Sequence, residues 1–383
     1  MIYHVELDII IYMQSKELRN QIIRYVIYII VVLGLTGFAF YLTIGNKASE
    51  VFSLIGKANI GWLLLILCVI ILCVLLRSVA IYVLAKIHVK EYSFHRAIAI
   101  DQNGVLYRMV TPAGLGSHVM QTLVLRKQKV SYFNALSVLA MYSIIYQIAL
   151  IFYNVMTLIV KHELISEIKY VDVAGVNFPL WVLVAIGFTF NLLVIGFILL
   201  ISYSKVIYRF VDGPIGKLLN KLRIVKDLDV FHKNLKEAVE GYRSNLKHIF
   251  THLPTFFISL AMFLLYITIS YSVPYFAGLA LGNSSMHANF WDSVLLSNFH
   301  QMTTCVIPIP GSSLVSEFFF YRLFYPESGP QFFMTEEVAR ASLLLWRSLM
   351  FIIPLFISCL YVIIYRPRRK NVNEDQKDQD IKE

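Results

Sequence analysis

Long runs of apolar residues, separated by short polar stretches, set the plan of this chain. A helix needs about 20 apolar residues to cross the roughly 30 Å hydrocarbon core of a bilayer. Runs of this kind predict six membrane-spanning helices, at about 22–44, 60–84, 132–160, 178–204, 253–281 and 338–365. The first run is longer than the apolar part of a secretory signal and follows a polar, amphipathic stretch, so we expect it to remain as a helix.

Two further apolar stretches are interrupted by proline and glycine. The first, 109–126, contains TPAGLGSH, and the second, 303–324, contains IPIPGSSLVSE. Lipid offers no water to freed backbone groups, so such breaks at membrane depth must be buried in protein or line a polar cavity. The two stretches occupy corresponding places in the two halves of the chain, an arrangement that marks the transport site in many secondary transporters.

Lysines and arginines that flank the spans predict the orientation, because they are retained on the cytoplasmic side. They gather before the first span, between the second and third, in 205–250, and after the sixth. By contrast the 282–290 loop carries no charged residue, and 161–177 is slightly acidic. We therefore expect a multi-pass protein with both termini in the cytoplasm.

With this orientation, each broken stretch must enter and leave on the same side of the membrane. The segment 97–127 is then a re-entrant hairpin from the cytoplasm, and 290–335 is one from outside. Each half reads span, span, hairpin, span, with halves of about 22–165 and 178–366. The expected fold class is an all-α polytopic membrane protein with about six transmembrane helices plus two re-entrant helical hairpins in an inverted-repeat arrangement.

Three polar segments flank or interrupt this membrane domain of 22–366. Residues 1–21 are expected to form a cytoplasmic N-terminal segment, and 367–383 a charged tail too short and polar to fold. The segment 206–250 has apolar residues at helical spacing among lysines. It is expected to lie along the inner surface, where it either binds anionic lipid or simply follows the positive-inside rule.

Composition supports the membrane class. Hydrophobic residues make up 58% of the chain and charged residues 15%, and the mean hydropathy is +0.66, whereas soluble domains average about 25% charged residues. The four cysteines lie in apolar runs, with neither disulfide pairing nor metal-ligand spacing to suggest another role: Cys68, Cys73, Cys305 and Cys359. We expect no metal, no cofactor and no nucleic-acid partner.

Ionisable residues inside the spans are candidates for function, because a central charge costs at least about 2.5–3.5 kcal/mol to insert. Glu317 and Arg347 lie deep in apolar sequence, and a pair between them would lower the cost of burying both, either as a structural pair or as part of a substrate site. Arg77 and Arg340 are alternatively expected to extend toward an interface. The remaining candidates are Asp101, Arg108, His118 and neighbouring Gln121 in the first hairpin, and Asp292, His300 and Arg322 in the second.

Proline and glycine in the two breaks suggest a binding mechanism. Proline removes helix donors and glycine permits tight turns. A helix that restarts after such a turn presents free N–H groups and a positive dipole end, which favour an anionic phosphate. The alternative is an ordinary kinked span. The residues concerned are Pro112, Gly114 and Gly116 in the first break and Pro308, Pro310 and Gly311 in the second.

Three motifs in the chain resemble those of a known family. They are TPAGLGSHVMQ at 111–121, PIPGSSLVSEFFFYRLF at 308–324 and ARASLLLWRSLMFIIP at 339–354. They are similar to motifs in the membrane domain of bacterial lysylphosphatidylglycerol synthase/flippase (multiple peptide resistance factor) proteins and their stand-alone relatives, over about 20–366. The resemblance places the functional core on Thr111, Pro112, Gly114, Gly116, Gln121, Pro308, Pro310, Gly311, Glu317 and Arg347.

The resemblance also implies a function and a location. It suggests a protein of the bacterial cytoplasmic membrane that moves a phospholipid or glycolipid, often charged, between leaflets. The bifunctional relatives carry a soluble aminoacyl-transferase domain after the membrane part, where this chain has only a short charged tail. We therefore expect a stand-alone member without that domain, whose partners are membrane lipids and whose oligomeric state is left open.

The working hypothesis is a lipid translocase that needs no covalent chemistry and is therefore not an enzyme. Arg108, Arg347 and the hairpin N–H groups would hold an anionic headgroup, while Glu317 and His118 would organise or gate the cavity. One alternative is a membrane scaffold or accessory subunit for a lipid-modifying enzyme, held by 206–250. A less favoured alternative is an intramembrane hydrolase, since no nucleophile elbow or paired-histidine metal motif is present.

Overall fold

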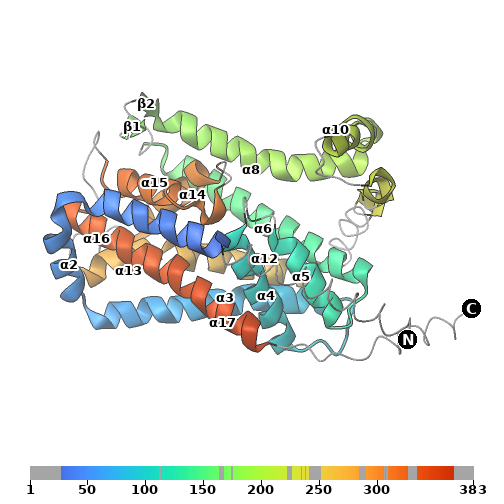
Figure 1. The fold of residues 1–383 in the computed structure, drawn as a ribbon, viewed down its shortest axis with the longest axis horizontal. Helices are drawn as coiled ribbons and strands as arrows, with labels where there is room; N and C mark the ends of the chain where they lie inside the picture. The colour runs from blue at the N-terminus through green and yellow to red at the C-terminus, as the bar shows by residue number, and fades with distance from the viewer. Residues whose placement is uncertain are drawn as a thin grey trace, which may run out of the picture.

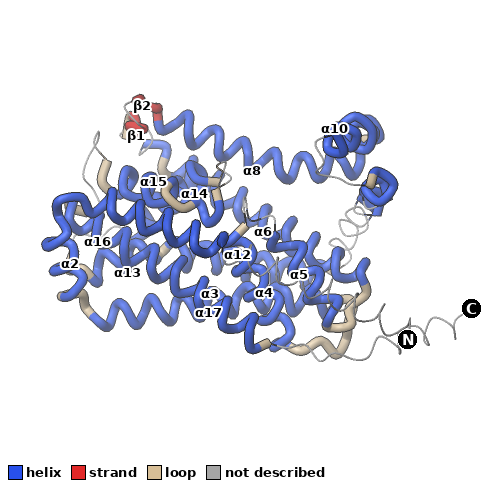
Figure 2. The backbone as a smooth tube through the Cα atoms, viewed as in Figure 1, coloured by secondary structure: helices blue, strands red, loops and turns tan. Residues whose placement is uncertain are grey.

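The computed structural model is a bundle of helices, most of which run roughly along one long axis (Figure 1). It describes residues 27–111, 114, 116–163, 168–173, 176–221, 227–233, 235–237, 239–240, 252–283, 290–305, 307, 309–326 and 334–365. Helices make up nearly all of this part, as Figure 2 shows. The expected terminal segments 1–21 and 367–383 lie outside the described residues.

Five helical stretches within the described residues are long and apolar enough to cross a membrane. They are Ile27–Gly56, Ile60–Lys86, Asn134–Val160, Leu253–Ala280 and Glu336–Ile364. Each coincides with one of the six expected spans. The remaining expected span corresponds to α8, Leu180–Tyr203, whose described apolar stretch covers the shorter range Leu180–Leu193. The protein is thus an all-α chain of membrane type.

The elements of the first half follow one another closely. The first helix, 27–44, leads through η1 (Gly45–Lys47) and α2 (Ala48–Gly56) into α3, Ile60–Lys86. The hairpin helices α4 and α5 span Phe94–Val110 and Gly116–Lys127, and α6 spans Tyr132–Val160. A short antiparallel strand pair, β1 (Tyr170–Val173) and β2 (Val176–Pro179), then leads to α8. Helical periodicity gave no indication of these strands.

The second half contains two bent spans. In the first, α12 (Leu253–Tyr271) is followed at once by α13 (Val273–Ala280), with Pro274 in the first turn of α13. In the second, α16 (Glu336–Arg347) continues through a π-helical turn, Ser348–Ile352, into α17, Ile353–Ile364. Proline lacks the N–H that the helix ladder needs, and a π-turn inserts one residue into it, so both features redirect a helix axis.

Both interrupted stretches form helical hairpins. In the first, α4 packs against α5, and in the second, α14 (Phe290–Thr304) packs against α15, Val315–Phe324. The break between α14 and α15 contains η5, Pro310–Ser312. The stretches predicted at 97–127 and 290–335 are therefore each two short helices joined by a break.

Hydrogen bonds show that the first hairpin starts and finishes at one end of the bundle. Gln128, just after α5, accepts a bond of 2.5 Å from the Tyr92 hydroxyl and donates to the Arg96 carbonyl (3.0 Å) and the Tyr365 hydroxyl (3.1 Å). Burial raises the pKa of the Tyr92 phenol, which therefore remains a donor at neutral pH. The beginning of α4 and the ends of α5 and α17 thus meet, at what we call the Gln128 end.

The second hairpin begins at the opposite end. Lys47 pairs there with Glu336 and Glu337 at the start of α16, with N–O distances of 3.1 and 2.6 Å. Lys161, just after α6, pairs with Asp292 in the first turn of α14 at 2.6 Å. The start of α16 and the finish of α6 are the ends of those helices distant from Gln128. The two hairpins therefore enter the bundle from opposite ends.

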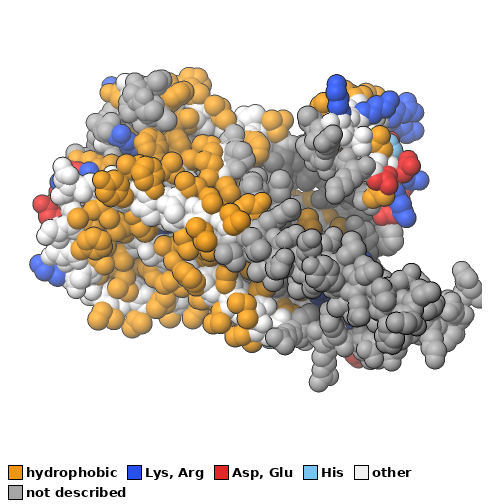
Figure 3. Space-filling view, in the orientation of Figure 1, with side chains coloured by type: hydrophobic (Ala, Val, Ile, Leu, Met, Phe, Trp, Pro, Cys, Tyr) orange, Lys and Arg blue, Asp and Glu red, His pale blue; other side chains and the backbone are white. Residues whose placement is uncertain are grey.

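Close backbone contacts hold the helices where apolar burial alone would not, since lipid is as apolar as leucine. The tightest is between α8 and α14, where a Cβ on Gly187 would lie 1.8 Å from the Met302 carbonyl oxygen. Only glycine lets the two helices approach so closely. Figure 3 shows the apolar side chains that cover much of the outer surface of the bundle on this face, as expected of a surface that meets lipid.

The segment 206–250 is not a single amphipathic helix in its described part. It is divided into α9 (Lys205–Phe210), a π-helical turn (Val211–Ile215) and α10 (Gly216–Lys221). Val211 and Val239 are the centre of a small core of its own. The apolar residues that suggested one helix on the membrane surface therefore pack partly on each other, while charged side chains gather around α10 (Figure 3).

Candidate functional site

The break of the second hairpin lies against the end of the first hairpin's leading helix. A Cβ on Gly311 would lie 3.3 Å from the Met109 carbonyl oxygen in α4 and 2.4 Å from the Phe351 ring. Gly311 also has φ +61°, a left-handed conformation that glycine adopts without strain. The position therefore requires glycine for both its space and its backbone angle, and it brings the two hairpins together.

The rest of this break is held in an unusual backbone conformation. Ser312 and Leu314 have φ values of 50° and 73°, which are uncommon for residues with a side chain. Such conformations cost on the order of 1–3 kcal/mol each and persist only where the surroundings impose them. The contacts of Arg347 and Ser313 supply that constraint.

Arg347, from the last residue of α16, pins the break. Its Nη2 donates to the Gly311 carbonyl and to Ser313 Oγ, both at 2.9 Å, and its Nε lies 2.6 Å from Glu317 Oε1. The guanidinium also stacks 3.8 Å above the Phe351 ring. Glu317 is 0% exposed and Arg347 4%. The expected Glu317–Arg347 pair thus exists, and it is engaged with groups of the protein itself.

The first break is closed by Thr111. Its hydroxyl donates to the Tyr107 carbonyl at 2.5 Å and accepts from the N–H of Gly116 at 3.0 Å, so it satisfies the first free donor of α5. Gly114 between them has φ +66°. The predicted residues Thr111, Gly114 and Gly116 therefore form one turn, whereas Pro112 lies outside the described residues.

Gln121 fastens the two helices of the first hairpin. It is 1% exposed, and its Nε2 donates weakly to the Ile100 carbonyl at 3.4 Å. A Cβ on Gly104 would lie 2.2 Å from that same nitrogen, so the amide occupies the space that the glycine leaves. Its role in the described structure is to pack α5 onto α4.

Arg108 lies beside the first break, and it has no acidic partner among the described residues. Arg108 is half-buried. A Cβ placed on Gly114 would lie only 3.0 Å from the Cγ of Arg108, so the two residues are close neighbours. The phenols of Tyr142, Tyr146 and Tyr266 lie in the neighbourhood of Arg108. An arginine among tyrosines, beside a helix break, can bind an anion through charge and hydroxyl donors.

A second arginine close by is fully paired. Arg77 of α3 forms two bonds to Asp101 of α4, Nε to Oδ1 at 2.7 Å and Nη2 to Oδ2 at 3.0 Å. Gln102 donates to the same carboxylate at 3.2 Å and accepts from the Ser358 hydroxyl at 2.9 Å. Span two, the first hairpin and span six are thereby joined by one polar network, and Arg77 does not extend to an interface.

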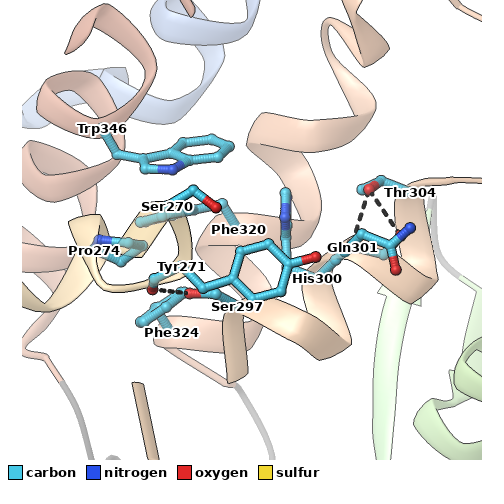
Figure 4. A pocket seen from close by; sticks show the side chains of 10 residues that line it. All are labelled: Ser270, Tyr271, Pro274, Ser297, His300, Gln301, Thr304, Phe320, Phe324 and Trp346. Carbon is cyan, nitrogen blue, oxygen red and sulfur yellow. Dashed lines mark hydrogen bonds between the residues drawn. The ribbon is translucent and has the colours of Figure 1, made fainter. Parts of the chain in front are cut away.

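Between the second hairpin and α12 lies a cavity of about 200 Å³, which we call the polar cavity (Figure 4). His300 stands in its wall and bonds through Nε2 to the Ser316 carbonyl at 2.9 Å. Tyr271, another lining residue, contacts Tyr153 edge to face, with ring centroids 6.0 Å apart. The cavity is lined by Ser270, Tyr271, Pro274, Ser297, His300, Gln301, Thr304, Phe320, Phe324 and Trp346.

The structure thus divides the predicted site residues into groups. Gly311, Glu317 and Arg347 meet, with Pro310 in the same break. Arg108 and Gln121 belong with the turn at Thr111, Gly114 and Gly116. His118 is exposed, with its Nε2 3.4 Å from Ser143 Oγ, and Pro308 lies outside the described residues.

Sequence reasoning missed the tyrosines between the two hairpins. Tyr142, Tyr146 and Tyr153 recur at helical spacing in α6, and Tyr266 and Tyr271 face them from α12. Phenols repeated on one face of an otherwise apolar span were the available signal. They make the space between the hairpins polar without adding charge.

Neither Ser117 nor Ser313, the serines of the two breaks, has a histidine partner among the described residues. Ser117 Oγ has no hydrogen-bond partner there, and Ser313 Oγ is bonded to Arg347 and to Thr36. His300 lies 3.3 Å from Ser316 Oγ, but the same Nε2 donates to a carbonyl and so carries the proton. Among the described residues, no group of three His, Cys, Asp or Glu side chains could hold a metal ion.

Comparison with known proteins agrees with this architecture. The protein-family model described as "Lysylphosphatidylglycerol synthase TM region" matches residues 22–358, which include both hairpins and most of the last span. No curated protein and no solved structure matches the chain. Because one family covers most of the chain, the protein belongs to the family of the lysylphosphatidylglycerol synthase transmembrane region.

Proposed function

We propose that this protein moves a lipid with an anionic headgroup between the two leaflets of the bacterial cell membrane. The family is a membrane domain connected with lipid chemistry, which supports a lipid-related role. The observation that carries the proposal is Arg108 beside the first helix break, which has no carboxylate partner among the described residues and lies near tyrosines in an otherwise apolar bundle.

Electrostatics explains why that arginine favours an anion. An arginine at membrane depth is costly unless it meets a counter-charge or water. Arg77 meets Asp101 through two hydrogen bonds, but no carboxylate among the described residues approaches Arg108. A phosphate bound there would neutralise the charge and accept from the nearby phenols, so its binding is favoured in a way that a neutral headgroup's would not be.

The arrangement of the hairpins supports an alternating path. They enter from opposite ends, and the second break, at Gly311, lies against Met109 near the end of α4. The two halves also pack against each other. Helix α3 of the first half contacts α12 of the second, α4 contacts α17, and α6 contacts α14. We propose that both hairpins are re-entrant, that the halves form an inverted repeat, and that the Gln128 end is cytoplasmic.

In this mechanism the Glu317–Arg347 pair holds the second break closed. Release of Gly311 and Ser313 from Arg347 would open the path toward the end opposite Gln128, where Lys47 pairs with Glu336 and Glu337. Separation of α4 from α5 near Thr111 would open it toward the Gln128 end. The headgroup would cross between the hairpins while the acyl chains stay in lipid, so the protein's own groups need only bind, orient and release the headgroup.

The test is exchange of fluorescent phospholipids between the leaflets of liposomes that contain the purified protein. Wild type should exchange an anionic phospholipid, and Arg108→Gln should reduce the rate at least tenfold. Arg96→Gln is the matched control, because Arg96 is an exposed arginine near the start of the same helix. Its rate should match wild type.

Two outcomes would contradict the proposal. If folded wild-type protein exchanges no lipid, a scaffold for a lipid-modifying enzyme becomes the better explanation. If Arg108→Gln and Arg96→Gln lower the rate equally, the loss reflects net charge, and Arg108 is not the headgroup site.

A further inference from the structure

We infer that the polar cavity binds the uncharged, hydroxyl-bearing part of a lipid headgroup, such as glycerol or a hexose. The inference deepens the proposed function, on which it rests for the assumption that the ligand is a lipid. It concerns a site separate from Arg108 and from the Glu317–Arg347 pair.

The serine and threonine hydroxyl groups that line the cavity have already donated their protons to the protein. Ser297 Oγ donates to the Tyr271 carbonyl at 3.0 Å, as Figure 4 shows, and Thr304 Oγ1 donates to the His300 carbonyl at 2.8 Å. Ser270 Oγ likewise donates to a backbone carbonyl, at 3.1 Å. A hydroxyl that has donated its proton keeps its oxygen lone pairs. These three side chains therefore offer acceptors to a ligand.

Two further side chains add acceptors. The Oε1 atom of Gln301 is buried and has no hydrogen-bond partner among the described residues. His300 donates through Nε2 to the Ser316 carbonyl, so its Nδ1 is an acceptor in the neutral ring. A buried polar atom without a partner is costly, and a ligand that donates to it removes that cost. The cavity is therefore matched to a ligand with several O–H or N–H donors.

The opposite wall is aromatic. Trp346 stacks on Phe320 with ring centroids 4.7 Å apart, and Phe320 stacks on Phe324 at 4.6 Å. Apolar walls with a few placed polar groups are typical of sites that bind small organic groups. The C–H faces of glycerol or of a sugar ring suit such a wall, while their hydroxyls reach the acceptors.

Charge decides between hydroxyl and ammonium donors. None of the residues that line the cavity is Asp, Glu, Lys or Arg. The carboxylate of Glu317, which is on α15 but does not line the cavity, is already paired with Arg347. An ammonium group would therefore be buried without a counter-charge, which is strongly unfavourable, whereas the burial cost of an uncharged hydroxyl group is offset by hydrogen bonds to these acceptors.

The size of the cavity agrees with a small headgroup. A volume of about 200 Å³ is room for roughly seven water molecules at about 30 Å³ each. That space suits glycerol or a single sugar and excludes a pair of acyl chains. The ligand would therefore place only its headgroup in the cavity.

The experiment compares lipids that differ only in headgroup. The full-length protein is purified in lauryldimethylamine oxide, which has no sugar to compete, and lipid binding is measured by native mass spectrometry. The probes share the same acyl chains and are phosphatidylglycerol, phosphatidylpropanol, phosphatidylethanolamine and a monohexosyl diacylglycerol. Phosphatidylpropanol is the matched control for phosphatidylglycerol, because it keeps the anionic phosphate but lacks the headgroup hydroxyls.

Two variants remove acceptors without changing side-chain size greatly. Thr304→Val and Gln301→Met should each weaken binding of phosphatidylglycerol and of the hexosyl lipid by about fivefold, the value of one hydrogen bond. They should leave phosphatidylpropanol unaffected. Thr303→Val is the control, since Thr303 donates to the same His300 carbonyl, at 2.9 Å, but does not line the cavity.

Equal binding of phosphatidylglycerol and phosphatidylpropanol would overturn the inference. So would stronger binding of phosphatidylethanolamine, or variants that are folded and keep the wild-type preference. The leaflet-exchange assay separates this result from the proposed function. Headgroup preference without exchange would contradict the translocase alone, whereas exchange without headgroup preference would contradict only the cavity assignment.

Discussion

The Glu317→Ala substitution tests how much the buried ion pair contributes to stability. Glu317 is 0% exposed, and its carboxylate lies 2.6 Å from Arg347. Removal of one partner of a buried pair costs about 3–5 kcal/mol, because the remaining charge loses its compensation. Arg347 keeps its bonds to Gly311 and Ser313, so we expect a loss near the lower limit, about 3 kcal/mol.

A second ion pair in the same chain is the control. Glu337 pairs with Lys47 at the same 2.6 Å distance, but both side chains are about one third exposed, at 34% and 33%. Exposed pairs of this kind contribute little, because water and salt screen them. Glu337→Ala should therefore change stability much less than Glu317→Ala, although the N–O distance of the ion pair is 2.6 Å in both cases.

Replacement of both buried partners separates pairing from packing. An apolar pair of similar size can replace a buried ion pair at little net cost, because no charge is left uncompensated. The double variant Glu317→Leu/Arg347→Met should therefore be less destabilised than the sum of its two single variants.

Stability would be measured by thermal and denaturant unfolding of the purified variants in one detergent, followed by fluorescence-detected size exclusion. The reasoning fails if Glu317→Ala loses no more stability than Glu337→Ala. It also fails if the double variant equals the sum of the single ones, since the two side chains would then act independently.

Three further predictions follow from close contacts. Gly187→Ala should destabilise the protein by about 1–3 kcal/mol, because the new methyl group meets a carbonyl of α14; Gly196→Ala, with open space around it, should not, and equal melting temperatures would contradict this. Thr36→Cys/Ser313→Cys, in a chain whose four cysteines are replaced, should form a disulfide, since the native hydroxyls are 3.1 Å apart; oxidation should stop lipid exchange and reduction restore it, whereas unchanged exchange would show that this break does not move. Asp101→Asn leaves a buried arginine with a neutral partner and should lower thermal stability, and an unchanged unfolding curve would contradict that.

The helices were predictable because their signals are local. Length and hydropathy give the spans, and the Pro-Gly breaks give the two hairpins, whose elements in the structure closely follow the expected ranges. The Glu317–Arg347 pair was also predictable, since two opposite charges deep in apolar sequence have few other ways to lower their cost.

The three-dimensional partners were less predictable. Asp101 as the partner of Arg77, and Ser313 as a ligand of Arg347, depend on how helices distant in sequence approach each other. The polar cavity is harder still, because its side chains come from five helices and none carries a net charge. The 206–250 segment shows the limit of periodicity, since a local core and a membrane-facing stripe have the same pattern.

The contacts of the second break have a consequence for the order in which the chain assembles. Ser313 bonds to Thr36, 277 residues earlier, while Gly311 and Glu317 depend on Arg347, which is synthesised after them. The second hairpin is therefore synthesised before the side chain that secures it. Until the last helix inserts, its strained turn and its buried carboxylate have no counterpart, so biogenesis of the native protein must conclude with that helix.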